Sequence, residues 1–197
     1  MNLLEQLIQL DQHITLWLNN LSTPVIDPVW MLFSDSRIWF PAYGIVMGVM
    51  IWRMGWKKGL AVVLSLIVCV VLTDQLSSAI KDGLERLRPC YNSWMIDNGL
   101  RLPYGITGHL FGFFSGHASN TFGFAAASFL GFKYNDTRHS YKAYGWGVGI
   151  WAALVALSRI MIGAHFLGDI LVGSLFGLAV GTAVAWTTRR VIVRAKG

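Results

Sequence analysis

Three short fragments, far apart in the chain, carry residue types that bind and cleave phosphate esters. Together they supply three cations, two imidazoles, a hydroxyl and a carboxylate. Guanidinium and ammonium groups hold phosphate oxygens, whereas an imidazole can transfer a proton or attack phosphorus. The combination indicates chemistry on a phosphate group. The fragments are Lys81-x6-Arg88-Pro89, Ser115-Gly116-His117 and Ser158-Arg159-x5-His165-x3-Asp169.

The first fragment places two cations on one side of a predicted helix. Lys81 and Arg88 are seven residues apart, so they lie on one helical face about 10 Å apart along the axis. Pro89 then stops the helix. The alternative is that both residues are anchors at a membrane boundary, with Lys81 paired to Glu85. Taken alone, this fragment favours the alternative.

The second fragment has the pattern of a helix start. Ser115 is a good N-cap, Gly116 lets a ligand approach the backbone, and N–H groups at a helix start favour an anion. His117 in the first turn can give a proton to a leaving group or take one from water. The alternative is a helix cap followed by an incidental histidine.

The third fragment pairs an imidazole with a carboxylate. His165 and Asp169 are four residues apart, which places both on one face of a helix that begins near them. The carboxylate can fix the ring tautomer and leave the other nitrogen free to attack phosphorus. Arg159 offers phosphate a planar fork of donors. The alternative is a pair that only ties the loop down, but three anion-suited fragments favour one site.

The composition is that of a membrane protein. The 197 residues are 54% hydrophobic and only 13% charged, whereas about a quarter are charged in soluble domains. The formal charge of +6 does not indicate nucleic-acid binding, because the basic residues lie between apolar runs or in the three fragments. Cys69 lies in an apolar run and Cys90 in a loop, so neither a disulfide nor a metal site is expected.

Five apolar runs are near the length that a helix needs to cross a bilayer. The predicted fold is therefore a single all-α domain, a polytopic transmembrane bundle over 37–187, preceded by an interfacial segment over 1–36. Within that segment, 3–18 reads as an amphipathic helix, and 24–33 leaves a sixth span open. Glycines at every fourth position of the last run indicate close helix packing. The five runs are 37–54, 59–80, 116–133, 144–161 and 168–187.

Basic residues are distributed unevenly between the two sides of this bundle. One side receives ten of the 16, and three of the other six belong to the fragments. Because cytoplasmic loops are enriched in Lys and Arg, the ten should be cytoplasmic, together with the C-terminus. All three fragments then face the extracytoplasmic or periplasmic side of the inner membrane. The ten are Arg53, Lys57, Lys58, Lys133, Arg138, Lys142, Arg189, Arg190, Arg194 and Lys196.

In order and spacing, the three fragments resemble the signature motifs of the type 2 phosphatidic acid phosphatase (PAP2) superfamily. One departure is Phe114, where the second motif usually has proline. The resemblance implies a helical, metal-independent enzyme without a cofactor. It further implies that His165 is the nucleophile, that Asp169 orients it, and that His117 is general acid and then general base. The groups implied to hold the phosphoryl oxygens are Lys81, Arg88, Ser115, Gly116 and Arg159.

Two other features have weaker interpretations. Asp74 lies within the second run, where a carboxylate suggests function, although pairing with a neighbouring helix is an equally good reading. The outer loop from Cys90 to Phe114 is expected to cover the site and help select headgroups. His109, in this loop, is read as a surface residue.

These observations predict a membrane phosphatase that removes the terminal phosphate from a lipid phosphate or diphosphate. Polyprenyl diphosphate ranks first among substrates and lipid A phosphate second, ahead of phosphatidylglycerol phosphate and phosphatidic acid. Two alternatives stay open: a lipid phosphotransferase that uses the same phosphohistidine, and a non-catalytic lipid or anion binder or transporter. Haloperoxidases share the motifs, but the high hydropathy argues against them.

Overall fold

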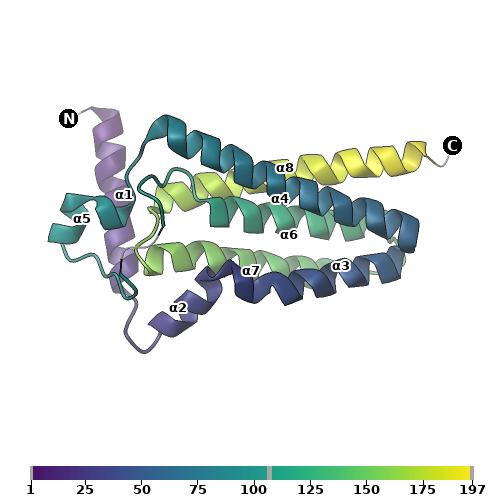
Figure 1. Cartoon of the computed structure of the whole chain (residues 1–197), viewed down its shortest axis with the longest axis horizontal. Helices are drawn as coiled ribbons and strands as arrows, with labels where there is room; N and C mark the ends of the chain where they lie inside the picture. The colour runs from purple at the N-terminus through teal and green to yellow at the C-terminus, as the bar shows by residue number, and fades with distance from the viewer. Residues whose placement is uncertain (1, 106–107, 196–197) are drawn as a thin grey trace.

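The computed structural model describes residues 2–105 and 108–195, and over these residues the chain is built from helices (Figure 1). The only β pairing in this part of the chain is an isolated bridge between Leu87 and Phe111. Two 3-10 turns, Ser36–Trp39 and Pro89–Tyr91, connect the α-helices. These are α1 (Leu3–Asn20), α2 (Asp27–Ser34), α3 (Phe40–Met54), α4 (Trp56–Leu84), α5 (Ser93–Asp97), α6 (Gly116–Asn135), α7 (Lys142–Met161) and α8 (Leu167–Arg194).

Five long helices run side by side, and the N-terminal helix lies across one end of them. Figure 1 shows α3, α4, α6, α7 and α8 along the long axis, with α1 and α5 at the end opposite the C-terminus. Helix α6 is central, because it packs against α4, α7 and α8. Many residues of α6 are small and buried. The apolar outer surface of the bundle is therefore formed by the neighbouring helices and not by α6.

Glycines set the close approach of α8 to α6. A Cβ atom built on Gly173 would lie 2.6 Å from the carbonyl oxygen of Ser115. Cβ atoms on Gly177 and Gly181 would overlap the backbone at Ser119 and Gly123. The expectation of close helix packing is therefore confirmed, and this packing fixes the start of α6 beside the first turns of α8.

All five predicted runs are helical, and three helices in the described chain are long and apolar enough to cross a membrane. These three are α4, α7 and α8. Helix α3 has only 15 residues, and α6 contains several Ser, Gly and Asn residues. Lys196, counted among the basic residues, lies outside the described residues. No disulfide joins Cys69 and Cys90.

The N-terminal segment forms two helices, and α1 is attached to the end of the bundle through its polar face. Asn19 donates to the carbonyl oxygens of Ile160 and Met161 at 2.9 and 3.1 Å. Thr15 Oγ1 accepts from the N–H of Leu167 at 2.9 Å, and Asp11 from that of Gly168 at 2.8 Å. These N–H groups have no partner within α8, so α1 caps that helix. Its apolar face, including Leu4, Leu7 and Trp17, is exposed.

Candidate active site

The three fragments meet at the end of the bundle where α1 lies. The first ends α4 and enters a loop, the second begins α6, and the third closes α7 and opens α8. Side chains from all three line one cavity of about 840 Å³. Those on its wall are Lys81, Arg88, Gly116, His117, Arg159 and His165. The predicted gathering of these residues is therefore present, while Ser115 and Asp169 lie behind the wall, fully buried.

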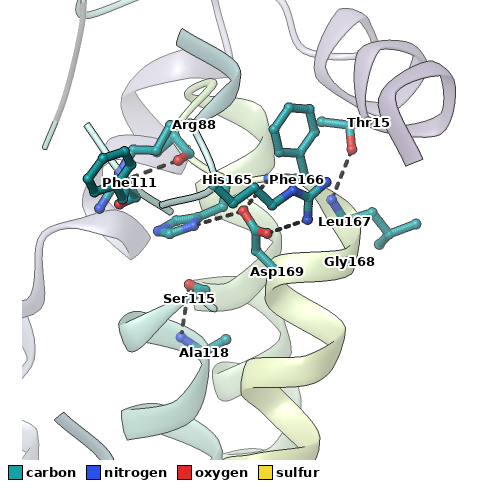
Figure 2. Close-up of polar contacts among 12 residues, drawn as sticks. Thr15, Arg88, Phe111, Ser115, Ala118, His165, Phe166, Leu167, Gly168 and Asp169 are labelled. Atoms are coloured by element: carbon teal, nitrogen blue, oxygen red, sulfur yellow. Dashed lines mark hydrogen bonds and ion pairs between the residues drawn. The ribbon is translucent and has the colours of Figure 1, made fainter. Parts of the chain in front are cut away.

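His165 and Asp169 form the predicted pair (Figure 2). His165 Nδ1 lies 3.3 Å from Asp169 Oδ2, and both side chains are buried. Asp169 Oδ2 also accepts the N–H of Phe166 at 3.1 Å. A carboxylate beside Nδ1 favours the tautomer with its proton there, which leaves the Nε2 lone pair available. The separation is slightly long, as is common before substrate binds.

A fourth cation, Arg86, holds the other oxygen of this carboxylate. Its Nη1 is 2.7 Å from Asp169 Oδ1, and its Nη2 is 2.7 Å from Asp11 Oδ2 on α1. The guanidinium also stacks over the ring of Phe166, 4.4 Å from its centroid. Sequence reasoning counted Arg86 and Asp11 only as charges. The one available signal was an extra arginine among the six spacer residues of the first motif.

Two arginines bring donors to the cavity. Arg88 Nε donates to the carbonyl of Phe111 at 3.1 Å, which holds the side chain in place. Arg159 Nη1 donates to Ser34 Oγ at the end of α2. The buried Nε–H of Arg159 has no hydrogen-bond partner within the described chain. Because a buried donor without a partner is costly, an anion in the cavity is the natural acceptor.

The helix start at Ser115 has the predicted geometry. The Ser115 hydroxyl accepts from the N–H of Ala118 at 3.4 Å, as an N-cap does (Figure 2). Its own proton remains available to donate. A Cβ on Gly116 would lie 3.2 Å from Lys81 Nζ, so glycine leaves room for this ammonium at the helix start. Phe114, the departure from the family pattern, is buried against Phe176 and stays off the cavity wall.

His117 projects from the first turn of α6 into the cavity. Its ring lies near the backbone of Ser34. Ser34 therefore contacts two candidate site residues, His117 through its backbone and Arg159 through its hydroxyl. Sequence reasoning missed this supporting role, and a serine at the end of a short helix gives no signal of it.

The outer loop covers the site, as far as it is described. A Cβ on Gly112 would lie 2.9 Å from Arg88 Cγ and 3.5 Å from His165 Nδ1. The N–H of Gly112 donates to the carbonyl of Arg86 at 2.8 Å. His109 is exposed, as predicted, but it also lies on the cavity wall. Residues 106–107 of the loop lie outside the described residues.

Burial and neighbouring cations keep His165 neutral. Burial is the main cause that lowers the pKa of His165 well below its usual value of 6.5, and the charges of Arg88, Arg159 and Lys81 lower it further. A neutral ring is the form that can attack phosphorus. The folded protein thus holds the nucleophile ready without a separate base to deprotonate it.

This depressed pKa predicts a pH-dependent stability. In the unfolded chain His165 takes up a proton near pH 6.5, whereas in the folded protein it does not. Stability is therefore full above that pH and falls as the pH drops toward the folded pKa, by up to about 1.4 kcal/mol per pH unit. Melting temperatures in detergent between pH 7.5 and pH 5 should fall more steeply for the wild type than for His165→Asn. Parallel curves would show that this proton is not coupled to folding.

Comparisons with known proteins agree with the motif pattern. Residues 58–192 match the family model described as PAP2 superfamily. A lipid A 4'-phosphatase of Porphyromonas gingivalis is 31% identical over 179 residues, which is 90% of this chain and 72% of that protein. A lipid A 4'-phosphatase of Bacteroides thetaiotaomicron is 26% identical over 176 residues, 89% of this chain and 75% of the relative.

Two solved structures share the fold. A transmembrane PAP2 type phosphatidylglycerolphosphate phosphatase from Bacillus subtilis has a TM-score of 0.72 at 20% identity, covering 94% of this chain and 88% of that one. Aquifex aeolicus LpxE has a TM-score of 0.60 at 19% identity, covering 87% of this chain and 92% of that one.

Proposed function

The chain belongs to the PAP2 superfamily, and from this membership and the geometry of its cavity we propose that it is a membrane enzyme that hydrolyses a lipid phosphate. The observation that carries the proposal is the two-part character of the cavity. One end has cations and two histidines. The other end is apolar, as a lipid chain requires, and is lined by Met47, Leu66, Ile67, Val70, Phe124 and Val155.

The reaction proceeds in two steps. His165 Nε2 attacks phosphorus and the bond to the lipid oxygen breaks, while His117 gives that oxygen a proton. A phosphohistidine and a lipid hydroxyl result. His117 then takes a proton from water, the water oxygen attacks phosphorus, and the phosphorus–nitrogen bond breaks to release inorganic phosphate.

The remaining site residues stabilise charge during these steps. Asp169 stabilises the imidazolium character that His165 acquires as it attacks. Lys81, Arg88 and Arg159 neutralise the charge that grows on the phosphoryl oxygens. The N–H of Gly116 donates to the same oxygens at the start of α6, and the Ser115 hydroxyl, predicted to do the same, instead caps this helix from behind the cavity wall.

Among substrates, a lipid A phosphate now takes precedence over polyprenyl diphosphate. Both curated relatives are lipid A 4'-phosphatases, and they cover most of the chain. The volume of about 840 Å³ is enough for a sugar phosphate together with the first part of its acyl chains.

The test is phosphate release by the purified protein in detergent, with EDTA present. The panel is lipid A, polyprenyl diphosphate, phosphatidylglycerol phosphate and phosphatidic acid. Release from lipid A despite EDTA is the expected result. Transfer of phosphate to an added lipid alcohol without free phosphate would identify a phosphotransferase. Binding without turnover of any lipid would contradict an enzymatic role.

The proposed topology has five spans, α3, α4, α6, α7 and α8, with α1 and α2 at the membrane interface. Helix α6 can be less apolar because its neighbours cover it. The uneven distribution of Lys and Arg supports an extracytoplasmic site and a cytoplasmic C-terminus. A green fluorescent protein fused to the C-terminus should fluoresce, and an alkaline phosphatase fused there should be inactive. The reverse result would invert the topology.

A further inference from the structure

Between its cationic and apolar ends, the cavity has a polar belt that the proposed chemistry does not use. The belt includes Ser78 and Asp74, which line the cavity three and seven residues before the phosphate-binding Lys81 and therefore lie on the same face of α4. Asp74 lies about 10 Å along the helix axis from Lys81. The next wall residues on that face, Val71 and Val70, are apolar. Asp74 thus marks the boundary between phosphate-binding and lipid-binding surfaces.

Asp74 is exposed within the cavity wall and is hydrogen-bonded to a neighbouring helix. Thr73, fully buried, donates to Asn120 Oδ1 at 2.7 Å, which directs the amide nitrogen of Asn120 toward the cavity side. Asn120 Nδ2 then donates to Asp74 Oδ1 at 3.2 Å. The predicted pairing with a neighbouring helix is therefore present. Asn120 and Asp74 both line the cavity.

The second carboxylate oxygen of Asp74 has no partner in the described chain. A lipid with only ester groups and hydrocarbon beyond its phosphate would cover this oxygen without a hydrogen bond, which is costly. A headgroup with hydroxyl or amide N–H groups at that depth would instead donate to it. The geometry therefore favours lipids with hydroxyl or amide N–H donors next to the phosphate over lipids that have only esters and hydrocarbon there.

We propose that Asp74 and Asn120 form a headgroup subsite that binds hydroxyl and amide N–H donors of a phosphorylated, acylated amino sugar. This inference rests on the proposed function, and it explains why the enzyme would prefer lipid A to other lipid phosphates. Asp74 accepts from the donors, and Asn120 fixes the position of Asp74. Phosphatidic acid has no such donors between its phosphate and its acyl chains, so it gains nothing from this subsite.

The test compares two substrates in two matched variants. For Asp74→Asn, the ratio of kcat/KM for lipid A to kcat/KM for phosphatidic acid should fall about tenfold to a hundredfold, as expected for loss of hydrogen bonds to a charged group. Asp82→Asn removes the same charge one residue beyond Lys81, from an exposed side chain that is not on the cavity wall. Its ratio should stay that of the wild type.

The other outcomes separate the possible reasons for failure. Asp74 also acts through space on the charge of Lys81, and if this is its whole role, both substrates should be affected alike and the ratio should not move. That result would overturn the inference. If Asp74→Asn does not fold, Asn120→Ala serves as the test instead. It should also lower the ratio of kcat/KM for lipid A to kcat/KM for phosphatidic acid. No phosphate release from any lipid by the wild type would instead contradict the proposed function itself.

Discussion

His165→Asn should lower kcat for phosphate release by about 10⁴-fold or more, because the variant has no nitrogen lone pair to attack phosphorus. Asparagine keeps a polar group beside Asp169, so the buried carboxylate is not left without a nearby donor. Binding of the lipid should change little, since the cations that hold phosphate remain. The measurement is inorganic phosphate released from lipid A by purified wild type and variant in the same detergent.

The covalent intermediate gives this prediction a second readout. Wild-type protein mixed with radiolabelled lipid and quenched in base should retain label that acid then removes, as a phosphorus–nitrogen bond requires. His13→Asn is the matched control, because it makes the same change at an exposed histidine that is not on the cavity wall. It should keep both activity and label. Substantial turnover by His165→Asn would assign the nucleophile to another residue.

The motif residues were predictable because their chemistry and their spacing are both local. Lys81 lies in the last turn of α4, but this helix ends at Leu84, so the predicted helical face shared with Arg88 is wrong: Arg88 reaches the cavity from the loop that follows. His165 and Asp169 are four residues apart at the start of α8, as predicted. That these pairs meet in one cavity followed from the expectation that all three fragments lie at one end of the bundle. Six of the eight predicted site residues line the cavity, and the other two, Ser115 and Asp169, support it from behind.

The supporting residues were not predictable, because their contacts join segments far apart in the chain. The pattern of 3–18 predicted an amphipathic helix at the membrane interface, without a partner for its polar face. In the structure, Asp11, Thr15 and Asn19 contact the loops that carry the site. An amphipathic pattern shows which residues avoid lipid, but it does not show whether water or protein meets them. The role of Arg86 was not predictable for the same reason, because its partners Asp11 and Asp169 lie 75 and 83 residues away in the chain.

We infer that Arg86 is a positioning residue, which acts on the reaction through Asp169. Arg86→Met should therefore lower kcat about 100-fold to 1,000-fold and leave KM nearly unchanged. Its guanidinium is the ion-pair partner of Asp169 at 2.7 Å, and the Asp169 carboxylate is fully buried. Removing one partner of a buried ion pair typically costs about 3–5 kcal/mol, because the other charge is left uncompensated. Asp169 would then take up a proton or move, and either change weakens its hold on His165.

The pH profile of kcat distinguishes a positioning role of Arg86 from a purely structural one. A purely structural role would reduce the amount of folded enzyme, which lowers activity and melting temperature without changing the pH profile. A positioning role predicts that the acidic limb of the kcat profile moves to higher pH, because an Asp169 that has lost its counter-charge protonates more readily. Arg86→Lys should restore part of kcat, and Arg37→Met, at an exposed arginine, should change nothing.

The same reasoning connects α1 to the reaction through Arg86. Asp11→Asn keeps an oxygen that can accept from the N–H of Gly168, but it removes the charge that holds Arg86 Nη2 at 2.7 Å. We therefore expect a smaller loss of kcat, about tenfold, because Arg86 keeps its contact with Asp169. If Asp11 acts only through Arg86, the double variant should be no slower than Arg86→Met alone. Losses that simply add would mean that α1 supports the site by another route.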